Sequence, residues 1–214
     1  MTQFTMQEAV RRLDGIFKED VIVCTGVGSH QQIVAREFTW DYPKRRLVTS
    51  SGHGTMGFGL PAAIGCALEA PDTPVLLING DGSMNMDMNH LSTVGELALN
   101  NLKIVVLDNS SMGIVRQFED LSDFVNVATR DRPNPDFAAI AEACGIPGFE
   151  VWPDREMKRE YDAADKLMRR RLLEDRYPDL IHMHVSDYSV WPILEGGHTS
   201  GEMTHGTHPG EYIP

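Results

Sequence analysis

Short apolar runs, rich in Val, Ile and Leu, alternate with helix-like segments along most of this 214-residue chain. This alternation constrains the fold more than any other feature, because it is typical of parallel sheets whose strands are joined by helices. Two of the runs, 75–79 and 104–108, are almost wholly apolar, as expected for strands covered on both faces. The predicted strands are 21–25, 46–49, 75–79, 104–108, 149–152 and 180–185. The predicted helices are 30–38, 60–69, 85–100, 136–144 and 154–174, with one more before the first strand, where Met6, Val10, Leu13 and Phe17 recur at helical spacing.

The pattern predicts an α/β fold, an open and mostly parallel six-stranded sheet with helices on both faces. Ligands bind to such sheets beyond the carboxyl ends of the strands. Residues 1–195 would form this single domain, and residues 196–214, rich in Gly, His and Thr, a C-terminal tail. The polar segment 120–135 is predicted to be a loop able to order over a ligand site.

The composition excludes several classes of protein. A formal net charge of −12 disfavours nucleic acid and anionic membrane surfaces as partners. No run approaches the roughly 18 apolar residues of a transmembrane helix, and residues 1–8 lack the build of a signal peptide. The three cysteines, Cys24, Cys66 and Cys144, lie in apolar runs and indicate free thiols in a reducing compartment. We therefore predict a cytoplasmic protein without a membrane or nucleic-acid partner.

Glycine-bearing turns follow three of the predicted strands, at 26–30, 52–59 and 80–83, and a fourth polar turn covers 108–113. Gly52, Gly54 and Gly57 satisfy the dinucleotide pattern G-x-G-x-x-G, which would require an acidic residue about 20 residues further on, at the end of the next strand. Asp81 is later than that and is followed at once by Gly82-Ser83. A dehydrogenase that binds its nucleotide through the turn at 52–59 is thus a weaker alternative.

Asp81 and Asn109 follow two consecutive strands, so their side chains are expected at the same sheet edge. A carboxylate, an amide oxygen and a turn carbonyl near Ser111 would suit Mg²⁺, with phosphate oxygens and water as its remaining ligands. Gly82 would let the backbone approach phosphate, and Ser83 would open a helix whose free N–H groups favour an anion. The alternative is a pair of tight turns that Asp81 and Asn109 merely cap.

From Gly80-Asp81-Gly82-Ser83 to Asn109 the chain resembles the cofactor signature of thiamine-diphosphate enzymes, in which a GDG turn is followed by an Asn after the next strand. The fuller resemblance, over roughly residues 6 to 197, is to the C-terminal, diphosphate-binding domain of the acetolactate synthase catalytic subunit. The stretches that carry it are 25–31, 54–65, 112–120, 135–137 and 143–148. The resemblance implies thiamine diphosphate and Mg²⁺ as cofactors and a small 2-oxo acid as substrate.

The resemblance also implies roles for individual residues. Asp81, Asn109 and the Ser111 carbonyl would hold Mg²⁺. Gly54 and Met56 would contact the aminopyrimidine through their backbone, and the Met56 side chain would wedge under the thiazolium and bend the cofactor. A plain core methionine is the alternative for Met56. The diphosphate would be lined by Gly28, Ser29, His30, Gly82, Ser83, Met112 and Gly113.

The chain departs from the acetolactate synthase pattern at several positions. Ser29 stands where Gln is usual, and His53 stands where Leu is usual and would be either an acid/base group or a turn-stabilising histidine. Asp108-Asn109 replaces the usual Asn-Asn pair and looks more like the sulfopyruvate and phosphonopyruvate decarboxylases. Phe118 replaces a Trp associated with choice of the second 2-oxo acid, so acetolactate specificity is not implied.

The family carries a pyrimidine-binding domain and a central domain ahead of this one, and its activating glutamate lies in the pyrimidine-binding domain. Glu8, Glu19 and Glu37 do not match that role. We therefore predict a hetero-oligomer or homodimer-based assembly in which a second, pyrimidine-binding chain supplies the glutamate. A fragment of a larger enzyme and a cofactor-holding or regulatory subunit without turnover are the alternatives.

The remaining histidines carry weaker signals. His182 and His184 share one face of a predicted strand, where a core or edge role is favoured over metal binding. His198, His205 and His208 fall in the predicted tail.

Overall fold

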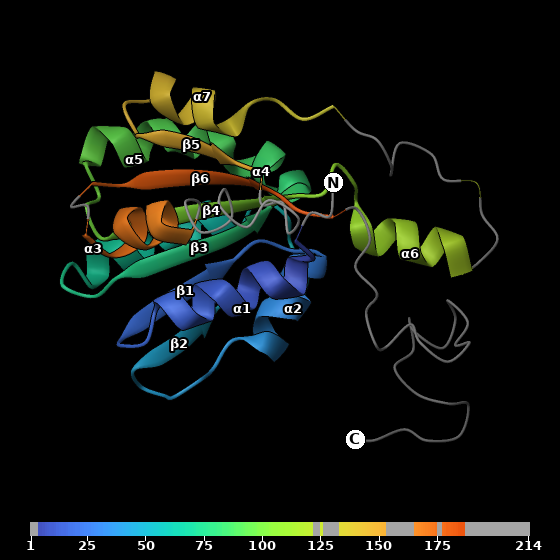
Figure 1. Ribbon diagram of the computed structural model, residues 1–214, viewed down its shortest axis with the longest axis horizontal. Coiled ribbons are helices and arrows are strands. Elements are labelled where there is room, and N and C mark those ends of the chain that lie inside the picture. The colour runs from blue at the N-terminus through green and yellow to red at the C-terminus, as the bar shows by residue number, and fades with distance from the viewer. Residues whose placement is uncertain (1–3, 122–124, 126–132, 153–164, 175–176, 187–214) are drawn as a thin grey trace.

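The computed structural model of the chain describes residues 4–121, 125, 133–152, 165–174 and 177–186. Its core is one six-stranded sheet in the order β2-β1-β3-β4-β6-β5, and every neighbouring pair is parallel (Figure 1). The predicted open α/β sheet is confirmed. The strands are β1 Val21–Thr25, β2 Arg45–Val48, β3 Val75–Gly80, β4 Leu102–Asp108, β5 Gly148–Val151 and β6 Asp179–His184.

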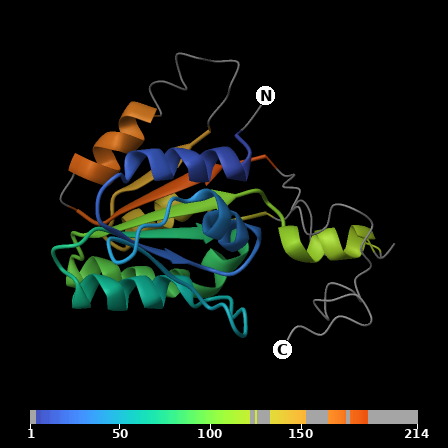
Figure 2. The same cartoon turned by 90° about the horizontal axis from the view of Figure 1, so that it is seen from below.

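Helices cover both faces of the sheet (Figure 2), as predicted. The α-helices are α1 Met6–Ile16, α2 Ser29–Glu37, α3 Gly59–Glu69, α4 Asp81–Asp87, α5 Leu91–Leu97, α6 Gly113–Leu121 and α7 Phe137–Ala143. A 3₁₀ turn, η1 (Met88–His90), joins α4 to α5, and residues 165–169 lead into the π-helical turn η2 (Arg170–Glu174).

The central strands β3 and β4 are buried along their whole length, which explains why most of their residues are apolar. Successive side chains alternate between two cores: Leu76 and Ile78 pack with α1 and α2, whereas Val75 and Leu77 pack with α3, α5 and α7. A polar residue without a hydrogen-bond partner would therefore cost stability on either face, and the polar residues that the strands do carry, such as Lys103, have partners.

The helix predicted before β1 is confirmed as α1, and a capping box fixes its start. Thr5 Oγ1 accepts a hydrogen bond from the Glu8 N–H at 3.2 Å, and Glu8 Oε2 accepts from the Thr5 N–H at 2.9 Å. Met6, Val10 and Leu13 are buried against the sheet.

The single helix predicted over 85–100 is wrong. The structure has α4, η1 and α5 there, and α4 starts at Asp81, directly after β3. The break follows Asp87, whose buried carboxylate accepts from the Leu60 N–H at 3.0 Å and from Asn79 Nδ2 at 3.1 Å. Because these bonds tie Asp87 to α3 and β3, the chain turns there. Burial raises the pKa of Asp87 to about 6, although these same bonds lower it.

Other expectations fall partly outside the described residues. Helix α6 was not predicted, and it takes up the first residues of the loop expected over 120–135. Most of that loop, the start of the helix predicted over 154–174 and the tail at 196–214 lie outside the described residues, so the boundary at residue 195 stays a prediction. Cys24, Cys66 and Cys144 are free thiols. Among the described helices, none has the length and apolar character needed to cross a membrane.

Candidate functional site

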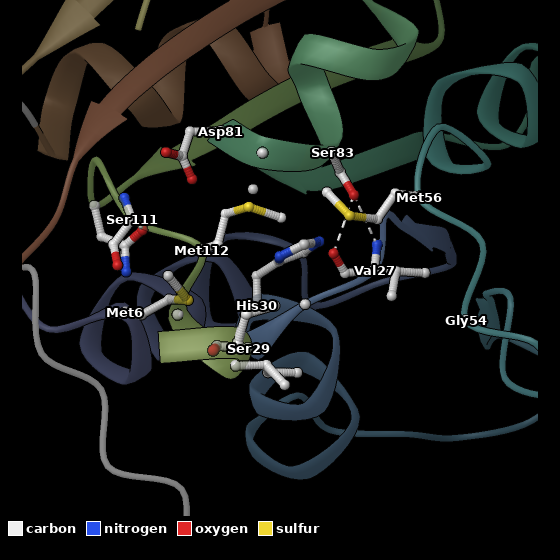
Figure 3. A pocket seen from close by; sticks show the side chains of 17 residues that line it. Met6, Val27, Ser29, His30, Gly54, Met56, Asp81, Ser83, Ser111 and Met112 are labelled. Atoms are coloured by element: carbon white, nitrogen blue, oxygen red, sulfur yellow. Dashed lines mark hydrogen bonds between the residues drawn. The ribbon is translucent and has the colours of Figure 1, made fainter. Parts of the chain in front are cut away.

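A pocket opens at the carboxyl ends of β1, β3 and β4 (Figure 3), where the topology of the sheet leads one to expect a ligand. Its lining includes every site residue predicted from the sequence except His53, which is exposed. The predicted residues that line it are Gly28, Ser29, His30, Gly54, Met56, Asp81, Gly82, Ser83, Asn109, Ser111, Met112 and Gly113.

The turn after β1 is clamped to the turn after β3 by one hydroxyl. Ser83 Oγ accepts from the Val27 N–H and donates to the Val27 carbonyl, both at 3.0 Å (Figure 3). Gly26 lies so close to this contact that a Cβ there would stand 2.0 Å from Asn79 Oδ1 and 2.7 Å from Ser83 Cβ. The turn therefore requires glycine at position 26. Ser83 is thus engaged with protein backbone, a role that its predicted contact with diphosphate did not anticipate.

His30 lies under the pocket and is 3% exposed. Its Nε2 has no hydrogen-bond partner among the described residues. Burial lowers the pKa of His30 to about 4, although a hydrogen bond to the Gly26 backbone raises it. The ring is therefore neutral at pH 7, and because its one N–H donates to the Gly26 backbone, Nε2 is left as a hydrogen-bond acceptor. Gly80 leaves room for it, because a Cβ at Gly80 would stand 2.6 Å from His30 Nδ1.

Two helices begin at the pocket without a side-chain cap. Gly28 precedes α2 and Gly80 precedes α4, and neither helix has a side-chain hydrogen bond at its N-cap. Ser29 Oγ, buried at the start of α2, is also without a partner among the described residues. Helix starts without a side-chain cap, with their positive ends, and unpartnered buried polar atoms are features that fit a diphosphate.

Three oxygen-bearing residues from the ends of β3 and β4 meet on another side of the pocket. Asp81, Asn109 and Ser111 are 3%, 6% and 4% exposed. Figure 3 shows the Asp81 carboxylate directed toward Ser111. Asn109 Oδ1 accepts from the Ser111 N–H at 3.3 Å, which closes the turn after β4. A carboxylate, an amide oxygen and a backbone carbonyl form a donor set of the kind that Mg²⁺ shares with phosphate oxygens.

Asn134 belongs to this site and was missed from the sequence. Its Nδ2 donates to Asp81 Oδ2 at 2.8 Å and to Asp108 Oδ1 at 2.9 Å. The only signal was its position between Pro133 and Pro135, which fix an extended segment but do not indicate what the amide contacts.

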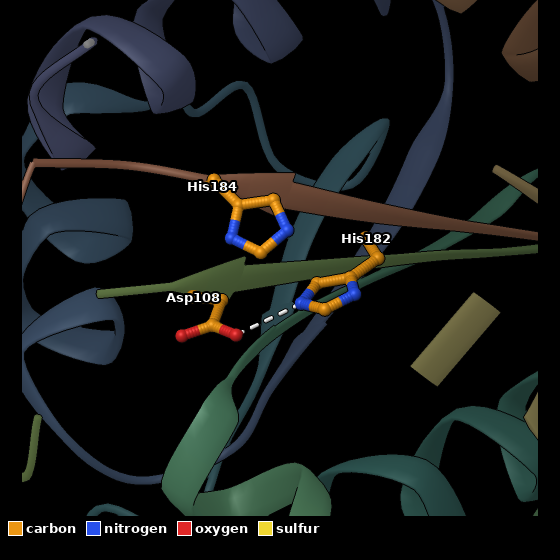
Figure 4. A group of neighbouring side chains, drawn as sticks. All are labelled: Asp108, His182 and His184. Atoms are coloured by element: carbon orange, nitrogen blue, oxygen red, sulfur yellow. Dashed lines mark hydrogen bonds and ion pairs between the residues drawn. The ribbon is translucent and has the colours of Figure 1, made fainter. Parts of the chain in front are cut away.

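Asp108, His182 and His184 form a cluster behind the turn after β4 (Figure 4). His182 Nε2 and Asp108 Oδ2 are 2.9 Å apart, and His184 Nε2 pairs with Glu150 Oε1 at 2.8 Å. Burial alone would raise the pKa of Asp108, but hydrogen bonds from His182 and the Ser110 N–H lower it below its usual value. Asp108 is therefore an anion with its donors already in place, which agrees with the core role expected of His182.

The turn that carries Gly54 and Met56 also borders the pocket. Gly54 has φ +60°, a left-handed conformation that favours glycine. Met56 is half-buried and lines the cavity, whereas His53 is exposed and is not among the lining residues, so its acid/base role stays a prediction. The apolar lining also contains Val27, from the turn after β1, and Met6, Ile114 and Val115, which were not predicted because α1 and α6 reach the pocket only through tertiary packing.

Comparison with known proteins gives the family. The family described as thiamine pyrophosphate enzyme, C-terminal TPP binding domain, matches residues 26–174. The chain is 37% identical over 188 residues to the acetolactate synthase isozyme 2 large subunit of Escherichia coli K12, covering 86% of this chain and 32% of that protein. It is 41% identical over 154 residues to the mitochondrial acetolactate synthase catalytic subunit of Aspergillus candidus, covering 72% of this chain and 22% of that protein.

A solved structure, the thiamine diphosphate-dependent 4-hydroxybenzoylformate decarboxylase of Rhodococcus jostii RHA1, shares the fold with a TM-score of 0.76 at 22% identity, covering 89% of this chain and 34% of that one. The chain thus spans about a third or less of the length of these proteins. The glycine turns, the pocket and these matches agree, and the chain belongs to the family of thiamine-diphosphate enzymes as an acetolactate synthase-like, C-terminal cofactor-binding domain.

Proposed function

We propose that this chain is the Mg²⁺- and diphosphate-binding part of a 2-oxo acid decarboxylase or carboligase that acts on a pyruvate-type substrate in the cytoplasm. The observation that carries the proposal is one pocket that combines uncapped helix starts with the oxygen donors Asp81, Asn109 and Ser111. An anion and a divalent cation are then bound side by side, as a magnesium diphosphate requires.

Different residues of the chain would bind the cation and the diphosphate. Asp81, Asn109 and the Ser111 carbonyl would hold Mg²⁺. Gly28, Ser29, His30, Gly82, Met112 and Gly113 would surround the diphosphate, and Ser83 would hold the two glycine turns together as well as line the site. When bound, thiamine diphosphate supplies the electron-accepting group for decarboxylation.

Met56 would wedge under the thiazolium, and the Gly54 and Met56 backbone would contact the aminopyrimidine. The half-buried Met56 side chain that lines the pocket supports this role, because a long and polarisable thioether can fill an irregular space beneath a ring. The apolar residues Ile114 and Val115 on α6 would exclude water from the same space.

The activating glutamate would come from a pyrimidine-binding domain on a partner chain, in a hetero-oligomer or homodimer-based assembly. The lining of the pocket supports this, since among the described residues its only carboxylate is that of Asp81. Decarboxylation would be followed by protonation or by ligation to a second carbonyl.

A second candidate is the β subunit of a sulfopyruvate- or phosphonopyruvate-type decarboxylase. The aspartate at position 108, hydrogen-bonded to His182, favours it, because the acetolactate synthase pattern has an asparagine there. A cofactor-holding subunit without turnover is the remaining alternative.

The proposal predicts that the purified chain alone releases almost no CO₂ from pyruvate, 2-oxobutyrate, sulfopyruvate or phosphonopyruvate in the presence of thiamine diphosphate and Mg²⁺. Adding the pyrimidine-binding chain purified from the same cells should raise the rate by at least about a hundredfold, because general acid–base groups contribute about 10²–10⁴ in rate. CO₂ release measures this. Full activity of the chain alone would contradict the shared site, and inactivity of the complex on all four acids would favour the regulatory alternative.

A further inference from the structure

Asn134 joins two buried carboxylates that stand at the ends of neighbouring strands. Its Nδ2 lies 2.8 Å from Asp81 Oδ2, after β3, and 2.9 Å from Asp108 Oδ1, at the end of β4. Asp81 and Asp108 are each 3% exposed. Two anions this far from solvent repel one another, and a donor placed between them relieves that repulsion.

The orientation of the Asn134 amide follows from its neighbours. An ionised carboxylate can only accept hydrogen bonds, so the NH₂ group must face Asp81 and Asp108. The amide oxygen faces the other way and accepts from Asn85 Nδ2 at 3.0 Å. Asn85 Nδ2 also donates to the Asp81 carbonyl at 3.0 Å, so Asn85 and Asn134 together bracket Asp81.

The second carboxylate, that of Asp108, accepts further hydrogen bonds. Asp108 Oδ2 pairs with His182 Nε2 at 2.9 Å (Figure 4), and Asp108 Oδ1 accepts from the Ser110 N–H at 2.7 Å. These hydrogen bonds fix the position of the Asp108 side chain at the end of β4, and the next residue along the chain is Asn109. The Asn134 amide ties the Asp81 side chain to the Asp108 side chain.

We propose that Asn134 is a positioning residue for the cation site, which holds the Asp81 carboxylate in register with the Asn109 turn before the cation binds. The inference rests on the proposed function, since it takes Asp81 and Asn109 as the cation's ligands. A hydrogen bond from a neighbouring residue to a metal-binding side chain raises metal affinity, because the side chain then loses little freedom when the metal binds. Asn134 precedes α7, so the same contact also couples that segment to the site.

The test is Mn²⁺ binding to the full chain in the presence of thiamine diphosphate, followed by electron paramagnetic resonance. Asn134→Ala should weaken Mn²⁺ binding about tenfold, the size expected for one hydrogen bond to a charged group. Asn85→Ala, which releases the Asn134 amide oxygen and the Asp81 carbonyl but leaves the bonds from Asn134 to the two carboxylates, should weaken it less. Excess Mn²⁺ should restore full cofactor occupancy in both variants. Asn89→Ala, which removes an exposed amide within η1, is the matched control and should leave the affinity unchanged.

Several results would overturn the proposal. Parental Mn²⁺ affinity in Asn134→Ala and Asn85→Ala would do so. The proposal would also be overturned if Asn134→Ala lost Mn²⁺ binding that excess Mn²⁺ does not restore and if the unliganded variant had a lower melting temperature. A purely structural residue would behave in that way. Asp81→Ala separates this failure from that of the proposed function. If Asp81→Ala also binds Mn²⁺ normally, the cation site itself is misplaced. If Mn²⁺ binding is lost in Asp81→Ala but not in Asn134→Ala, only the positioning role of Asn134 is wrong.

Discussion

Replacing Asp81 by alanine is expected to weaken Mg²⁺-dependent binding of thiamine diphosphate by at least about a hundredfold, because loss of even an outer residue of a metal site costs about 10–100-fold. Asp81 follows the buried strand β3 and supplies the carboxylate of the proposed donor set. Without it the cation loses its one negatively charged protein ligand in the described lining, and the diphosphate loses the charge that the cation neutralises. Titration calorimetry with thiamine diphosphate at saturating Mg²⁺ measures the change.

Asp72→Ala is the matched control for Asp81→Ala. Asp72 is exposed, in the turn that precedes β3 at the opposite end of the strand from the pocket. Asp72→Ala removes one negative charge, as Asp81→Ala does. It should leave cofactor affinity within about twofold of that of the parent chain, because an exposed charge beyond the Debye length of roughly 8 Å is largely screened. Unchanged affinity in Asp81→Ala would remove Asp81 from the metal site.

The second large effect is expected from Gly26→Ala. The new Cβ would stand 2.0 Å from Asn79 Oδ1, and Asn79 cannot swing aside. Its Oδ1 accepts from the Gly80 N–H at 3.1 Å, and its Nδ2 donates to the buried Asp87 carboxylate at 3.1 Å. We expect a loss of about 1–3 kcal/mol in the free energy of unfolding, typical of overpacking, together with weaker cofactor binding as the first glycine turn moves. Urea unfolding measures the former.

Gly65→Ala provides the opposite control. Gly65 lies exposed in α3, and a Cβ there meets nothing within 4 Å. Alanine in a helix interior should stabilise the chain by about 0.5–1 kcal/mol. If Gly26→Ala were as stable as Gly65→Ala, the close approach of the turns after β1 and β3 would be wrong.

The sheet and the pocket's main residues could be predicted because their signals are local in the sequence. Strands covered on both faces are mostly apolar, and turns that approach phosphate need glycine, so β3, β4 and the residues that follow them can be recognised from the residue order. Parallel strands then bring those turns to one edge. The resemblance to the family had implied that Gly28, Asp81 and Gly113 share one site, and the three residues do line one pocket at that edge.

The parts that were missed depend on contacts between distant segments. Asn134 has an ordinary loop sequence around it, and its importance comes from two carboxylates 53 and 26 residues away. Met6 has the periodicity of a core residue, and only the packing of α1 brings it to the pocket. The break after Asp87 likewise arises from hydrogen bonds to Leu60 and Asn79, so helical periodicity over 85–100 gave no sign of it.

The most direct test of the central claim, a pocket built for magnesium diphosphate, is a thermal shift of the purified chain with three additions: thiamine diphosphate plus Mg²⁺, thiamine diphosphate plus EDTA, and NAD. Only the first addition is expected to raise the melting temperature. At a ligand concentration of 100 Kd the stabilisation is about 2.7 kcal/mol, or roughly 5–10 °C for a chain of this size. Stabilisation by NAD alone, or by thiamine diphosphate equally with and without Mg²⁺, would contradict the central claim.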